Sequence, residues 1–214
     1  MKTVLAASAV LAAVGTVNAA VVTQTQPFAF PLSPGNQSLV FNQFNPALGT
    51  LTKVELLFDG AISADATAEN DSVLPAPAFG LSLSGNMSVS FVTLSGVGIV
   101  NTVFSQALDA TDNAGVANGS GPDFHDFGNI GDVVSGDDDT MAGLGAYVGL
   151  GTLNANVNGS AGFSFTGTTD ATLGIDNLGT AGEVTINYYY DPIPTPGALA
   201  LFGAAGLGAL RRRR

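Results

Sequence analysis

The sequence of 214 residues contains no cysteine and no tryptophan, one histidine and only six lysine and arginine residues. Without cysteine, the chain has no disulfide, no zinc–thiolate site and no cysteine nucleophile. The scarcity of basic residues disfavours nucleic-acid binding, which needs clustered Lys and Arg to displace counterions from phosphates. These absences exclude disulfide-stabilised, zinc–thiolate and cysteine-dependent functions, and they disfavour a nucleic-acid-binding function.

Acidic residues dominate the charge, with 17 Asp and Glu and a net charge of −11. The basic residues are confined to Lys2, Lys53 and the last four positions of the chain. With both ends removed, 17 acids face Lys53 alone, which gives a net charge of −16. Such a surface remains soluble through self-repulsion and attracts cations weakly.

The first 19 residues have the pattern of a secretory signal peptide. Lys2 supplies a positive charge, residues 4–14 are apolar except for one serine, and residues 17–19 are small. Signal peptidase reads small residues at these positions. We therefore predict export, with cleavage between Ala19 and Ala20.

The C-terminal residues 192–214 combine three features in a fixed order. A proline motif comes first, formed by Pro194, Thr195 and Pro196. Residues 197–210 follow without a charge, and as a helix they would cover about 21 Å, less than the roughly 30 Å of a hydrocarbon core. Cationic flanks resist translocation, and here the chain ends in Arg211, Arg212, Arg213 and Arg214. This arrangement predicts a short transmembrane helix with a stop-transfer cluster.

The proline motif, the apolar helix and the arginine cluster resemble the PEP-CTERM sorting signal of bacterial surface proteins. The residues Pro194, Thr195 and Pro196 resemble a variant of its Pro-Glu-Pro motif. The resemblance implies processing by an exosortase-like membrane protease-transpeptidase after an inner-membrane-anchored stage. It also implies a final place at the cell surface or in the extracellular matrix, with a link to exopolysaccharide and biofilm.

Residues 20–191 alternate apolar and polar side chains and carry turn residues every eight to twelve positions. This pattern predicts one all-β domain, an antiparallel β-sandwich or jelly roll. In the last strand, Val184, Ile186, Tyr188 and Tyr190 should share one face. The other expected strands lie within residues 21–25, 37–41, 51–58, 78–84, 88–94, 98–104, 146–157, 162–165 and 171–175.

Residues 110–145 are rich in Gly, Asp and Asn, and we expect long surface loops there. Asn-Gly at 118–119 and at 158–159 predicts turns. Five Asn-x-Ser triplets match the N-glycosylation pattern, and we interpret them as turn composition. They begin at Asn36, Asn70, Asn86, Asn118 and Asn158.

Residues 41–54, FNQFNPALGTLTKV, resemble the opening F-x-P-x-L-G-T-L-x-x-V of the choice-of-anchor E domain. Residues 184–190, VTINYYY, resemble the closing strand of the same family. The resemblance implies a small, β-rich extracellular module that occurs with alternative C-terminal anchors and has no established activity. It therefore indicates where the chain is placed and says nothing of chemistry.

Candidate chemical groups are few. Asp137, Asp138 and Asp139 form the densest run of acids and are a candidate calcium site, because oxygen-rich loops hold Ca²⁺. Residues 109–113 look like a calcium loop but fail the EF-hand template, which needs Gly at position 6 and Glu at position 12. His125 lies between acids, yet one histidine cannot by itself form the usual transition-metal sites.

We therefore expect a non-enzymatic surface or matrix protein without a required cofactor. Its expected partners are signal peptidase, the exosortase-like protease, the membrane and exopolysaccharide. One alternative is a calcium-dependent carbohydrate-binding adhesin. Another is a secreted glycan hydrolase that uses an acid pair within residues 109–139.

Overall fold

The computed structural model describes residues 19–193. The signal peptide predicted over residues 1–19 lies outside this range except for Ala19. Also outside it are Pro194, Thr195 and Pro196, the helix predicted over residues 197–210, and the arginines 211–214. Within residues 19–193, no helix is long and apolar enough to cross a membrane.

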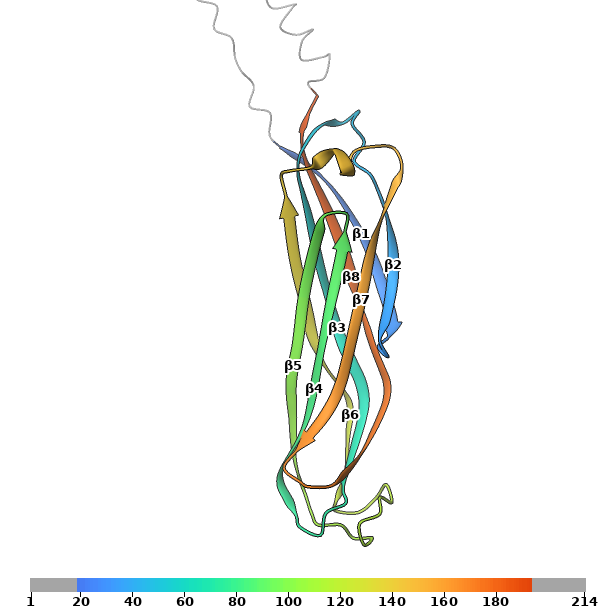
Figure 1. Cartoon of the computed structure of the whole chain (residues 1–214), viewed down its shortest axis with the longest axis vertical. Coiled ribbons are helices and arrows are strands. Elements are labelled where there is room, and N and C mark those ends of the chain that lie inside the picture. The colour runs from blue at the N-terminus through green and yellow to red at the C-terminus, as the bar shows by residue number, and fades with distance from the viewer. Residues whose placement is uncertain (1–18, 194–214) are drawn as a thin grey trace, which may run out of the picture.

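Eight antiparallel strands make up most of the described chain and form an elongated molecule (Figure 1). The two longest have 22 residues each, against about 5–6 in a typical strand. A single 3-10 turn, η1 (Leu144–Tyr147), precedes the seventh strand. The strands are β1 (Ala20–Pro31), β2 (Gly35–Asn42), β3 (Gly49–Asn70), β4 (Ala76–Phe91), β5 (Leu94–Leu108), β6 (Phe124–Thr140), β7 (Thr152–Thr166) and β8 (Ala171–Pro192).

The strands form two four-stranded sheets. Sheet 1 has the order β1-β8-β3-β6, and sheet 2 has the order β2-β7-β4-β5. The chain is wound as four antiparallel pairs, β1 with β8, β2 with β7, β3 with β6 and β4 with β5. Such nested pairs in two facing sheets form a jelly roll. The predicted all-β antiparallel sandwich is therefore confirmed.

The core lies between the sheets because every second side chain of each strand points inward. Val184, Ile186 and Tyr188 are fully buried in β8, as the alternation predicted. Aromatic rings also meet across the sheets, and Phe79 of β4 packs against Phe127 of β6 with ring centroids 6.5 Å apart. Burial of each large apolar side chain contributes about 1.5–3 kcal/mol.

Edge strands β5 and β6 lie side by side where the two sheets meet. Asp138 Oδ2 accepts a hydrogen bond from the backbone N–H of Ser95, at 2.8 Å. Asp132 accepts a hydrogen bond from the Thr102 hydroxyl, and that bond lowers the pKa of Asp132 below its ordinary value. The two aspartates thus join β6 to the other sheet.

The prediction of long surface loops over residues 110–145 is wrong for half of this range, because β6 occupies residues 124–140. Its glycines and aspartates disfavour a strand. However, β3 pairs with it along nearly its whole length, and Ile130 and Val134 supply buried anchors. Pairing across the sheet outweighs the local preference.

Three local predictions are also corrected. Asn158 and Gly159 lie in the middle of β7, paired on both sides, and form no turn. The strand expected over residues 146–157 begins only at Thr152, after the 3-10 turn. In β3, strict alternation from Val54 and Leu56 would place Thr52 on the inward face, but a register shift between Leu51 and Lys53 buries Leu51 instead. At residues 118–119 the chain bends within the β5–β6 loop, with a φ of +73° at Gly119.

Candidate functional site

The four strands of sheet 2 contain no charged residue and no histidine. Their inward positions fill the core, and their outward positions on β2, β7 and β4 carry mostly amide and hydroxyl groups. We call this surface the neutral face. It comprises Asn36, Ser38 and Asn42 of β2, Asn154, Asn156, Asn158 and Ser160 of β7, and Ser84, Asn86, Ser88 and Ser90 of β4.

Strand register arranges these groups in rows across the sheet. Asn36 lies opposite Asn158, which lies opposite Ser88. Neighbouring strands are about 4.8 Å apart, so a row places hydrogen-bonding groups at that spacing. The same row reaches Val97 on the edge strand β5, where Ile99 also faces outward with 76% of its surface exposed.

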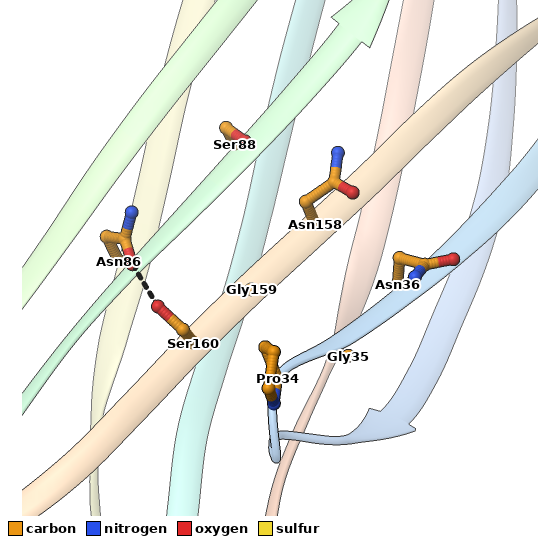
Figure 2. A pocket seen from close by; sticks show the side chains of 8 residues that line it. All are labelled: Pro34, Gly35, Asn36, Asn86, Ser88, Asn158, Gly159 and Ser160. Atoms are coloured by element: carbon orange, nitrogen blue, oxygen red, sulfur yellow. Dashed lines mark hydrogen bonds between the residues drawn. The ribbon is translucent and has the colours of Figure 1, made fainter.

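A shallow hollow of about 320 Å³ lies on the neutral face (Figure 2). Within it, the Ser160 hydroxyl and the Asn86 Oδ1 atom are hydrogen-bonded at 2.6 Å. The hollow contains no carboxylate, imidazole or amine, so its chemistry is hydrogen bonding without proton transfer. Its lining residues are Pro34, Gly35, Asn36, Asn86, Ser88, Asn158, Gly159 and Ser160.

Three of the five Asn-x-Ser triplets meet in this hollow, those beginning at Asn36, Asn86 and Asn158. Their interpretation as turn composition is wrong, because all three lie within strands. The middle residues, Gln37, Met87 and Gly159, occupy inward positions of their strands, so the outer two residues of each triplet lie on the outward face. The sequence signal that could have revealed the face is the absence of charge over residues 72–108 and 140–169.

Sheet 1 has the opposite character, because acids line its outer surface. Asp59 of β3 lies directly opposite Glu183 of β8. The acids on this surface include Glu55, Asp59, Asp65, Asp137, Asp139, Asp176 and Glu183. The fold therefore separates an acidic face from a neutral one.

Lys53 and Glu55 lie at the centre of a polar network on the acidic face. Lys53 Nζ lies 3.1 Å from Glu55 Oε1 and 3.6 Å from Asp139 Oδ2. Glu55 also accepts hydrogen bonds from Asn187 at 3.0 Å and from the Tyr189 hydroxyl at 2.8 Å. The bond from Asn187, followed by those from Tyr189 and Lys53, lowers the pKa of Glu55.

Asp137, Asp138 and Asp139 do not converge on one point. As consecutive residues of β6 they alternate in direction, with Asp138 turned toward Ser95 and Asp139 toward Lys53. Among residues 19–193, no group of three or more Asp, Glu or His side chains could hold a metal ion. Calcium binding at these three residues stays a prediction.

His125 lies on β6 opposite Ala68 of β3. Its ring packs edge-on against Phe127, with centroids 4.7 Å apart. The region of the expected acid pair, residues 109–139, is divided between the β5–β6 loop and β6.

Comparisons with known proteins give no relative from which a function could be taken. No family model and no curated protein matches the chain. The solved structures of the Gx and Gt strains of infectious bursal disease virus are matched at 9% and 10% identity, with TM-scores of 0.14 and 0.13. Each match covers 83% of this chain and 41% of the viral chain, and at these scores neither supports an argument.

Proposed function

We propose that this chain is an exported, non-enzymatic surface or matrix protein that binds uncharged polysaccharide through its neutral face. The observation that carries the proposal is the complete absence of charge from the strands of sheet 2 in a strongly acidic protein. Such a surface suits a ligand that is itself neutral and rich in hydroxyl groups.

The chemistry of the face matches a sugar polymer on two counts. Asparagine amides both donate and accept hydrogen bonds, as sugar hydroxyls do. Val97 and Ile99, beside the amide rows, offer apolar contact for the C–H surfaces of sugar rings. Each exposed hydrogen bond contributes only about 0.5–1.5 kcal/mol, so binding requires several rows and an extended ligand.

The charge of the rest of the protein favours a neutral partner over an acidic one. Lys53 is the sole Lys or Arg within residues 19–193, where all 17 acids also lie. An anionic polymer would approach against this field, whereas a neutral polymer would not. The proposed ligand is therefore a neutral glycan.

The placement of the chain ends supports anchoring at one end of the domain. Ala20, at the start of β1, lies opposite Tyr190 near the end of β8. Figure 1 shows that both ends of the domain leave the sandwich on the same side. In the proposal, signal peptidase removes the leader, the tail after Ile193 holds the protein in the membrane, and an exosortase-like enzyme then processes it.

Binding can be tested with the full-length protein and insoluble neutral glycans, such as cellulose, chitin and starch, against an acidic polymer such as alginate. We expect retention on at least one neutral glycan and none on alginate. Replacement of Asn36, Asn86 and Asn158 by Ala together should weaken binding at least tenfold, which corresponds to about 1.4 kcal/mol.

The matched control replaces three exposed residues on the outer surface of sheet 1 by Ala, namely Thr23, Thr25 and Ser135. This control should bind like the wild type. Equal binding by the two triple variants, or stronger retention on alginate, would refute the proposal. The intact mass of protein recovered from the native envelope tests export and processing separately, since an uncut chain would contradict both.

A further inference from the structure

The loop between β5 and β6, residues 109–123, lies at the end of the sandwich opposite the two chain ends (Figure 1). Three carboxylates are buried at this end, Glu69 with 3% of its surface exposed, Asp71 with 9% and Asp123 with none. Glu69 is fully satisfied, because its two oxygens accept the N–H groups of Asn118 and Gly119 at 2.7 Å each.

Only one of the two carboxylate oxygens of Asp123 has a hydrogen-bond partner. Its Oδ2 atom accepts the backbone N–H of Asp112 at 3.0 Å. Its Oδ1 atom is buried and has no hydrogen-bond partner. A buried carboxylate oxygen without a partner is costly, and buried charges in proteins are normally paired or bound to a metal ion.

The free oxygen of Asp123 points into a space that it shares with Asp112. A Cβ atom at Gly121 would contact both Asp123 Oδ1, at 2.8 Å, and Asp112 Oδ2. The glycine, with a φ of +99°, therefore lets two carboxylate oxygens approach the same small volume. Asp112 is held in place from its other side, because its Oδ1 atom accepts a hydrogen bond from Asn118 at 2.8 Å.

No lysine or arginine of the described range can compensate these two carboxylates. Lys53 is the only one, and it is paired with Glu55 at the other end of the sandwich. Asp112 is exposed, so an ion from solution can reach the pair.

We propose that Asp112 and Asp123 bind a calcium ion beside Gly121. Calcium takes oxygen ligands in flexible geometry and accepts water at the remaining positions, which suits a site with two carboxylates in a loop. The ion would neutralise the buried Asp123 and fix the β5–β6 loop at the end of the protein farthest from the anchor. The site differs from the run at residues 137–139 and does not depend on the polysaccharide proposal.

For the test, the full-length protein is freed of metal with EDTA and is then titrated calorimetrically, once with CaCl₂ and once with MgCl₂. Extracellular calcium modules bind with dissociation constants of about 0.1–1 mM, and we expect a value in this range. At 5 mM CaCl₂, ligand linkage should also raise Tm by a few degrees. Asp112→Asn should weaken calcium binding at least tenfold without affecting folding, because the side chain is exposed. Asp123→Asn should also weaken calcium binding at least tenfold.

The matched control is Asp137→Asn with Asp139→Asn, which removes two exposed acids from sheet 1 and should bind calcium like the wild type. Absence of calcium binding by the wild type would overturn the proposal. So would unchanged binding by Asp112→Asn, an equal loss in the control, or equal affinity for magnesium.

Discussion

At the scale of single residues, Glu55 shows how the acidic face retains one ordered polar network. Its carboxylate accepts hydrogen bonds from Asn187, Tyr189 and Lys53. These bonds hold its pKa below the ordinary value of 4.5. Since the folded-state pKa is lowered, the stabilisation is fully present above pH 4.5 and is lost as the pH falls through the lowered value.

We therefore expect Glu55→Gln to lower the free energy of unfolding by about 0.5–1.5 kcal/mol at pH 7. The difference from the wild type should shrink as the pH falls below 4.5 and the wild-type carboxylate is protonated. Urea unfolding at several pH values measures both effects. Asp59→Asn, which removes an exposed acid of the same strand that lies opposite Glu183, is the control and should not lower the free energy of unfolding. A difference that grew at low pH would contradict the assignment.

At the scale of elements, β6 remains a strand because its glycines and aspartates suit the contact between the edge strands β5 and β6, where the two sheets meet. A Cβ atom at Gly136 would lie 2.5 Å from the Phe58 ring, which is almost fully buried. A Cβ atom at Gly96 of β5, in the other sheet, would lie 3.1 Å from the same ring. These glycines, which made the segment look like a loop, leave room for a core aromatic side chain.

Gly136→Ala should therefore destabilise the protein by about 1–3 kcal/mol, as expected for overpacking. Gly162→Ala on β7 is the matched control, because its Cβ atom would have open space. That control should be neutral or more stable by about 0.4–1 kcal/mol, since alanine restricts the unfolded chain. Chemical unfolding of both variants measures the difference, and equal stabilities would contradict the overpacking of Gly136→Ala against Phe58.

At the scale of the whole molecule, self-repulsion opposes folding. Within residues 19–193 the net charge is −16, and like charges lie directly opposite each other at Asp59 and Glu183 and at Asp65 and Asp176. Such pairs are destabilising, and salt screens them, with a Debye length of about 10 Å at 0.1 M.

We expect Tm to rise by a few degrees between 10 mM and 300 mM NaCl, with EDTA present to exclude calcium. Tetramethylammonium chloride should give the same rise, because screening does not depend on the identity of the cation. A Tm that falls with salt would show that attractive charge pairs dominate instead.

The sequence by itself determined the β class, the inward face of β8 and the acidity of the protein, because alternation and charge are local properties of the chain. It also predicted the sorting tail, which lies outside the described residues. The strand status of residues 124–140 could not be predicted, since it depends on pairing with β3, distant in the sequence.

Only the tertiary structure decided which polar residues meet. Asn36, Asn86 and Asn158 are separated by 50 and 72 positions in the chain, yet strand register places them around one hollow. Asp112 and Asp123 are close in sequence, but the fold alone buries Asp123 with one oxygen unpartnered and leaves Asp112 at the surface. Composition sets which groups are available, and long-range pairing sets their distances and burial, on which binding depends.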